Sequence, residues 1–136
     1  MPDFDAITIG ESLPPLQLPP LSRFTLALYC GASGDHNPIH VDIDYARNVA
    51  GRDDVIGHGS LTMAYLGRML ANRVPLKNVR RFSVRLHAPT RIGDAILCTG
   101  KVIEKIDKEE KLIRVALRAE TGAGICLASG EAVLVF

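Results

Sequence analysis

A long helix is predicted over residues 58–74, which read HGSLTMAYLGRMLANRV. An ordinary surface helix carries a single apolar stripe. In this stretch the apolar side chains fall on nearly every side of a helix: Leu61, Met63, Ala64, Tyr65, Leu66, Met69, Leu70 and Ala71. We therefore expect a helix that is buried on most of its sides, places both of its methionines in the core and is stopped by Pro75.

The sequence after this helix predicts antiparallel strands. Phe82, Val84 and Leu86 alternate with polar residues, and further apolar runs lie within 95–106, 112–120 and 125–136. Turn residues separate these runs, and such short connections imply antiparallel neighbours. One buried helix followed by these strands indicates an α+β domain in which a curved antiparallel sheet wraps around the helix.

The sequence before the helix predicts an arm and two shorter helices. Residues 1–20 hold five prolines and read as an extended arm on the surface with one short edge strand. Ser22 caps a helix that runs to Ala32, with Phe24, Leu28 and Tyr29 on its inner side.

A second short helix is expected after this one. Asp42 or Asp44 caps it, and it extends through Val49 and is ended by Gly51. Residues 51–57 are then a polar loop that can cover a substrate.

Length and composition exclude several classes of protein. A chain of 136 residues predicts one domain, 1–136, and 47% hydrophobic residues with 23% charged ones are typical of a globular protein. A net charge of +1 gives no general attraction to nucleic acid or to an anionic membrane. Cys30, Cys98 and Cys126 are expected to be buried thiols, which suits a reducing cytoplasm, and neither a signal peptide nor a membrane span is predicted.

The candidate chemistry lies in a turn over residues 34–42, which read GDHNPIHVD. Gly-Asp and Asn-Pro pairs favour turns, and Asp and Asn can simply bond to the local backbone there. A turn does not, however, need an imidazole two residues after the proline. Asp35 supplies a carboxylate, Asn37 both donates and accepts, and His40 carries the side chain best suited to proton exchange near neutral pH. Together these three residues can hold and polarise one water molecule.

Residues 29–42, YCGASGDHNPIHVD, resemble the signature of the MaoC-like dehydratases and R-specific enoyl-CoA hydratases, a branch of the hot-dog fold superfamily. Residues 56–61, IGHGSL, resemble the segment that opens the central helix of that family. The resemblance implies a hot-dog domain that forms a homodimer or a dimer of dimers. It also implies hydration of 2-enoyl thioesters, or dehydration of (3R)-3-hydroxyacyl thioesters, carried by coenzyme A or acyl carrier protein, with no cofactor.

The same resemblance assigns roles to particular residues. It makes Asp35 and His40 the catalytic pair that grips the water, and it leaves open which is the acid and which the base. Asn37 orients the loop or the water. The backbone N–H of Gly59, at the start of the long helix, is the candidate donor to the thioester oxygen.

Three further residues, Ser60, His58 and Arg85, are candidates for substrate binding: His58 matches a residue of the family, Ser60 departs from the usual pattern of the family, and Arg85 belongs to a basic group. His58 is equally explained by capping and packing, and His36 is expected to face solvent. Arg80, Arg81, Arg85 and Arg91 either meet phosphates or an acidic carrier protein, or simply form a solvated face. The histidines and aspartates in this part of the chain fit no standard zinc spacing, so no metal is predicted.

Two other functions use the same fold and ligand. One is an acyl-thioesterase, in which a carboxylate activates water towards the thioester carbon. The other is a non-catalytic acyl-binding subunit of a heteromeric dehydratase. The presence of both Asp35 and His40 favours hydration over either alternative.

Overall fold

The alternation of apolar and polar residues after position 78 produces four long strands. The computed structural model, which describes residues 3–136, has them as β2 (Val79–Leu86), β3 (Ile96–Asp107), β4 (Leu112–Thr121) and β5 (Cys126–Val135). A two-residue strand, β1 (Leu16–Gln17), pairs with β3, and the antiparallel sheet has the order β1-β3-β4-β5-β2. The predicted strands and their antiparallel pairing are confirmed.

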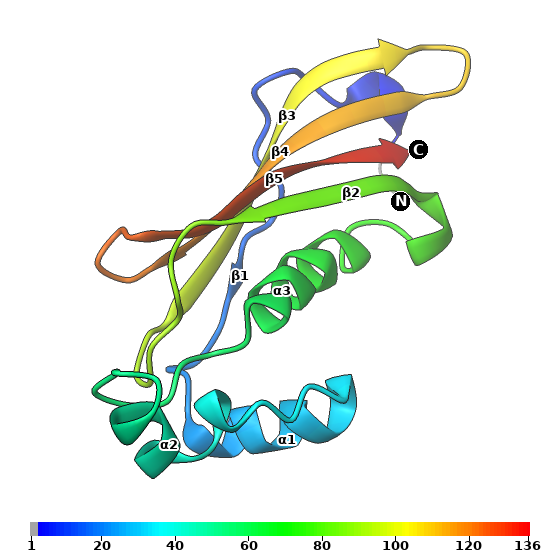
Figure 1. Ribbon diagram of the computed structural model, residues 1–136. Helices are drawn as coiled ribbons and strands as arrows, with labels where there is room; N and C mark the ends of the chain where they lie inside the picture. The colour runs from blue at the N-terminus through cyan, green and yellow to red at the C-terminus, as the bar shows by residue number, and fades with distance from the viewer. Residues whose placement is uncertain (1–2) are drawn as a thin grey trace.

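The helix α3 (Gly59–Ala71) lies across the concave side of this sheet (Figure 1). Leu66, Met69 and Leu70 of α3 are buried in one core with inward-facing strand residues such as Val115 and Leu134. The predicted arrangement of a curved sheet around one helix is therefore confirmed.

Two details of the prediction for this helix are wrong. Met63, Ala64, Arg68 and Ala71 form an exposed side, so the helix is not buried on most of its sides, and only Met69 of the two methionines is a core residue. The α-helix also ends at Ala71, before Pro75, and residues 72–74 form a turn in which the N–H groups of Arg73 and Val74 both donate to the carbonyl of Leu70. The prediction failed since apolar periodicity shows which side chains are apolar and does not show how much of the helix the sheet covers.

The N-terminal segment is part of the core. Residues 1 and 2 of the predicted arm lie outside the described residues. The rest contains the expected short edge strand β1 and also a short 3₁₀ helix, η1 (Phe4–Ala6), which was not predicted. Phe4, Ile7, Leu13 and Leu18 are nevertheless buried against the sheet, so the prediction of a surface arm is wrong for these side chains.

The helix α1 (Arg23–Ser33) begins at the predicted cap, where the Ser22 hydroxyl accepts a hydrogen bond from the backbone N–H of Thr25. Its predicted inner face is correct for Tyr29, which packs half-buried on the core, and wrong for Phe24 and Leu28. Leu26 and Cys30 are buried, whereas Phe24 is 72% exposed and Leu28 59% exposed. Both pairs have helical i, i+4 spacing and lie on roughly opposite sides, so spacing alone did not distinguish them.

The remaining elements are short. The helix α2 (Ile43–Asn48) is capped by the carboxylate of Asp42, and two 3₁₀ turns, η2 (Pro38–His40) and η3 (Leu76–Asn78), complete the chain. Cys30 and Cys98 are buried as expected, Cys126 is partly buried, and burial raises the pKa of the Cys98 thiol to about 11. Within residues 3–136 no helix has the length and hydropathy to cross a bilayer.

The pairing of β2 with β5 depends on the absence of a side chain at Gly130. A Cβ atom at this position would lie 2.0 Å from the carbonyl oxygen of Ser83 in the neighbouring strand. We expect Gly130→Ala to lower the free energy of unfolding by about 3 kcal/mol or more, because the two backbones must separate. Urea unfolding followed by circular dichroism measures this change.

Gly122→Ala is the matched control, since Gly122 has no other heavy atom within 4 Å of an added Cβ. It should leave the unfolding midpoint nearly unchanged. Equal midpoints for Gly130→Ala and Gly122→Ala would contradict the packing described for β2 and β5.

Candidate active site

The loop after α1 is held by its own side chains. Gly34 has a φ of 74°, a left-handed conformation that ends α1, and its N–H bonds to the carbonyl of Cys30. The Ser33 hydroxyl accepts from the N–H of Asp35 and donates to the carbonyl of Tyr29. The Asp35 carboxylate is thereby placed just beyond the helix end, with 46% of its side chain exposed.

Asn37 shapes the next turn. Its Oδ1 accepts from the N–H of Ile39 at 3.1 Å and so caps the 3₁₀ turn η2, which ends at His40. The N–H of Asn37 itself donates to Oδ1 of Asp35 at 3.2 Å. Of the two roles considered for Asn37, the geometry therefore favours orientation of the loop.

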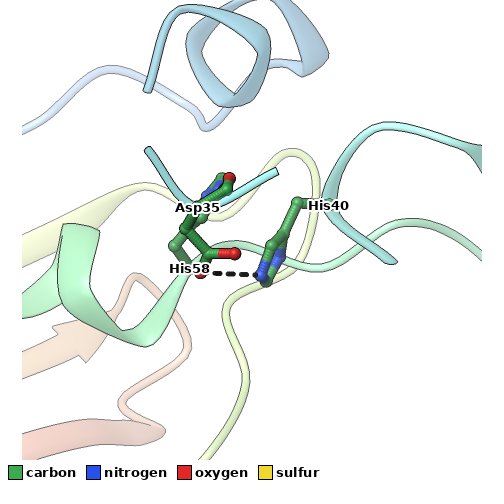
Figure 2. A group of neighbouring side chains, drawn as sticks. All are labelled: Asp35, His40 and His58. Atoms are coloured by element: carbon green, nitrogen blue, oxygen red, sulfur yellow. Dashed lines mark hydrogen bonds and ion pairs between the residues drawn. The ribbon is translucent and has the colours of Figure 1, made fainter. Parts of the chain in front are cut away.

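His40 is fixed by a backbone carbonyl. Its Nδ1 lies 2.7 Å from the oxygen of Ile56, and a carbonyl only accepts, so Nδ1 carries the hydrogen. The other ring nitrogen, Nε2, lies 3.7 Å from Oδ2 of Asp35 (Figure 2). This nitrogen is therefore available for proton exchange beside a carboxylate.

His58 lies beneath this pair and is fully buried. Its ring stacks on that of His40, with 3.7 Å between centroids and 23° between planes, and its edge meets the Tyr29 ring. Its Nε2 donates to the backbone carbonyl of Asp35 at 3.2 Å and lies 3.6 Å from the Cys30 sulfur. His58 thus connects α1, the loop and α3 by packing and by one hydrogen bond. It does not line the cleft beside His40.

Burial lowers the pKa of His58 below its usual value of 6.5, since desolvation penalises the charged imidazolium. His58 is consequently neutral at neutral pH.

Gly59 follows directly as the first residue of α3. The N–H groups of a first helical turn have no acceptor within the helix, and the helix dipole favours negative charge there. A Cβ at Gly59 would lie 2.3 Å from Cδ1 of Leu86, so the glycine lets this side chain cover the helix start.

A cleft of about 320 Å³ joins His40 and Gly59. Its inner wall is buried and its rim is formed by the chain that leaves β2. The lining residues are His40, Ile56, Gly57, Gly59, Thr62, Leu86, His87, Ala88, Pro89 and Thr90. Ile56 and Gly57 come from the predicted covering loop, whereas its residues 51–55 line a separate hollow with Arg91.

The structure brings some predicted residues together and separates others. Asp35, His40 and His58 meet, and Gly59 shares the cleft with His40. Ser60 instead accepts a hydrogen bond from the Tyr29 hydroxyl at an exposed position. Arg85 follows Val84, which packs on the core, so its side chain leaves the opposite face of β2 and within this chain it is not part of the site. His36 is exposed, as expected.

Sequence reasoning missed four lining residues, Thr62, Leu86, His87 and Thr90. Thr62 comes from α3 and the other three from the end of β2 and the connection after it, and no short motif joins these segments.

Asp35, His40 and His58 place possible metal-binding atoms within 4.8 Å of one another. Their geometry fits a metal poorly, however. The two imidazoles are stacked in nearly parallel planes, so their in-plane lone pairs do not converge on one point. Each ring also has one nitrogen engaged with a backbone carbonyl. The arrangement is better suited to holding a water molecule and moving its protons.

A sheet curved around one central helix defines the hot-dog class of protein, and here an Asp–His pair lies beside the start of that helix. The chain belongs to the MaoC-like domain family, whose profile matches residues 6–123. It is 31% identical over 117 residues to an (R)-specific enoyl-CoA hydratase of Rhodospirillum rubrum, covering 85% of this chain and 79% of that protein.

Solved structures agree with this assignment. The unliganded R-hydratase PhaJ1 from Pseudomonas aeruginosa superposes with a TM-score of 0.83 at 25% identity, covering 97% of this chain and 83% of that one. A structure described as a MaoC-like dehydratase gives a TM-score of 0.87 at 33% identity, covering 99% of this chain and 42% of the other. The predicted family and hot-dog fold are therefore confirmed.

The burial of neutral His58 makes stability depend on pH. An unfolded histidine binds a proton more readily than folded His58, so the free energy of unfolding should fall as the pH drops below about 6.5. In His58→Gln this part of the pH dependence should disappear. Chemical unfolding between pH 8 and pH 5 measures the slope for each protein.

His36→Gln removes an exposed histidine and should keep the wild-type slope. If His58→Gln also kept that slope, the burial of a neutral imidazole at this position would be disproved.

Proposed function

We propose that this protein is a hydro-lyase that adds water to 2-enoyl thioesters, or removes it from (3R)-3-hydroxyacyl thioesters. The thioester is carried by coenzyme A or by acyl carrier protein. The observation that carries the proposal is the pairing of His40 Nε2 with Asp35 Oδ2 at 3.7 Å, while His40 Nδ1 is held by the Ile56 carbonyl. The R-specific relative described above supports the same stereochemistry.

The pair suits a water molecule that donates both of its hydrogens. Neutral His40 offers a lone pair at Nε2 because its hydrogen is on Nδ1, and ionised Asp35 also accepts. A water that donates one hydrogen to each acceptor turns its oxygen lone pairs away from them, towards the carbon that it attacks. In this geometry both Asp35 and His40 position the water molecule, and either residue can take its proton.

The reaction then requires one proton to return and one charge to be stabilised. As the water oxygen bonds to C3, one water proton passes to the pair and the electrons of the C2–C3 double bond move onto the thioester oxygen. In this proposal the N–H of Gly59, which lines the cleft with His40, donates to that oxygen. The proton held by the pair then moves to C2 and completes the addition of one water molecule.

Asp35→Asn and His40→Ala test this mechanism. We expect each to lower kcat for hydration of crotonyl-CoA by about 100- to 10,000-fold, since each removes a group that exchanges a proton with the water. Loss of the conjugated enoyl absorbance measures hydration, and a thiol reagent in a parallel assay measures hydrolysis. Asp44→Asn, which changes an exposed carboxylate of α2, is the control and should retain wild-type activity.

Two results would contradict the proposal. Release of free thiol would assign the protein to the thioesterases. Unchanged hydration in Asp35→Asn would disprove the catalytic role of the pair.

A homodimer is part of this proposal. The edge of β2 that faces away from β5 has no strand paired to it within residues 3–136, and the apolar side chains of Phe24 and Leu28 are exposed on α1. An unpaired strand edge is a common site of association. We expect light scattering on the purified protein to give at least twice the chain mass of 14.7 kDa, and a monomer at micromolar concentration would contradict this.

A further inference from the structure

Two buried threonines face each other in the cleft beside the catalytic pair. Thr62 of α3 is 2% exposed, Thr90 of the β2–β3 connection is 3% exposed, and both line the cleft. Their Oγ1 atoms lie 3.1 Å apart and form one hydrogen bond.

This single hydrogen bond leaves a donor unused. Each threonine hydroxyl has one hydrogen to donate and two lone pairs to accept with. Within residues 3–136 neither hydroxyl has another partner, so one O–H of the pair is buried with no protein acceptor. Such a donor is costly to leave unpaired, and in this structure an occupant of the cleft is the group that can accept from it.

The pair is held at a fixed place relative to the reacting groups. Thr62 follows Gly59 by three residues, so both lie on the same side of α3, about 5–6 Å apart between their side-chain positions. The carbonyl of Thr90 accepts a hydrogen bond from the N–H of Gly57 at 2.8 Å, which ties the connection to the segment before α3. Both threonines therefore line, from fixed elements, the cavity that also contains His40.

The other residues that line the cleft restrict which ligand group can accept a hydrogen bond from the free threonine O–H. Ile56, Leu86, Ala88 and Pro89 are apolar, and the polar His87 has its Nε2 within 2.7 Å of the Ser129 hydroxyl. Among residues 3–136 no Lys, Arg, Asp or Glu lines the cleft. A carboxylate on the ligand would be buried there with no Lys or Arg to compensate its charge. An acyl group that is apolar except for one neutral oxygen matches both the unpaired threonine O–H and the lining of the cleft.

We propose that the Thr62–Thr90 pair selects acyl groups that carry a neutral hydrogen-bond acceptor, such as a hydroxyl or ketone oxygen, beyond C3. The inference rests on the proposed hydration and names the class of acyl thioester on which it acts. A purely hydrocarbon chain would leave the O–H unpaired, whereas an oxygen-bearing chain of the same shape would satisfy it.

The test compares substrates that differ only in a methyl group replaced by a hydroxyl. Two such pairs are trans-2-pentenoyl-CoA with trans-4-hydroxy-2-butenoyl-CoA, and trans-2-hexenoyl-CoA with trans-5-hydroxy-2-pentenoyl-CoA. We expect the wild-type protein to show the higher kcat/KM for the hydroxyl-bearing member of at least one pair. Thr62→Val and Thr90→Val, which keep the side-chain shape, should each lower that preference by roughly 5- to 150-fold.

Thr99→Val is the matched control for the two variants. Thr99 lies on β3 between the buried residues Cys98 and Gly100, so its side chain leaves the other face of the sheet. It should keep the wild-type preference, and thermal melts of all three variants establish that they are folded.

Binding distinguishes a failure of this inference from a failure of the proposed hydration. Calorimetry with hexanoyl-CoA and 5-hydroxypentanoyl-CoA, which lack the reactive double bond, reports the preference of the cleft without turnover. A wild-type preference for the hydroxyl-bearing thioester that Thr62→Val removes would support the inference even if no hydration occurred. Equal affinity for both thioesters would overturn it. An equal loss of kcat/KM for both members of each substrate pair in Thr62→Val would also overturn it. The threonine hydroxyls would then contact a part of the ligand that all acyl thioesters share.

Discussion

The concave face of the sheet has to be covered by apolar side chains, and α3 provides them. Leu66, Met69 and Leu70 are buried against the inward-facing residues of the strands, which fixes the position of the helix on the sheet. The N-terminal end of α3 is thereby set beside the connection between β2 and β3. The free N–H groups of the first turn, the cleft and the buried threonines all owe their positions to this packing.

Hydrogen bonds to backbone carbonyls give the two central histidines, His40 and His58, different roles. The carbonyl of Ile56 holds the hydrogen of His40 on Nδ1 and leaves Nε2 free beside Asp35, while the carbonyl of Asp35 engages Nε2 of His58. Burial keeps His58 neutral, so the stack beneath His40 adds no positive charge to the pair. One imidazole is thus available for proton exchange and the other supports it, although the residue type is the same.

Sequence reasoning found the part of the site that is continuous in the chain. Asp35, Asn37 and His40 lie within six positions, and a turn of that composition has a recognisable chemistry. Partners from distant segments had no such signal, because Ile56 acts through its backbone and Thr90 reaches Thr62 only when the chain is folded. Part of the inner face of α1 was missed for a related reason, since its two apolar i, i+4 pairs differ only in what packs against them.

The sequence by itself determined the class of fold, the strands, the helix cap at Ser22, the pair Asp42 and Asp44 from which the second cap comes, and the loop that carries the Asp–His pair. These features are local, since they depend on alternation, turn residues and side chains that bond to neighbouring backbone. Only the tertiary structure decided how much of α3 is covered, which tautomer His40 adopts, where Arg85 lies and what lines the cleft. Each of these depends on contacts between segments far apart in the chain, and no local pattern of residues encodes such contacts.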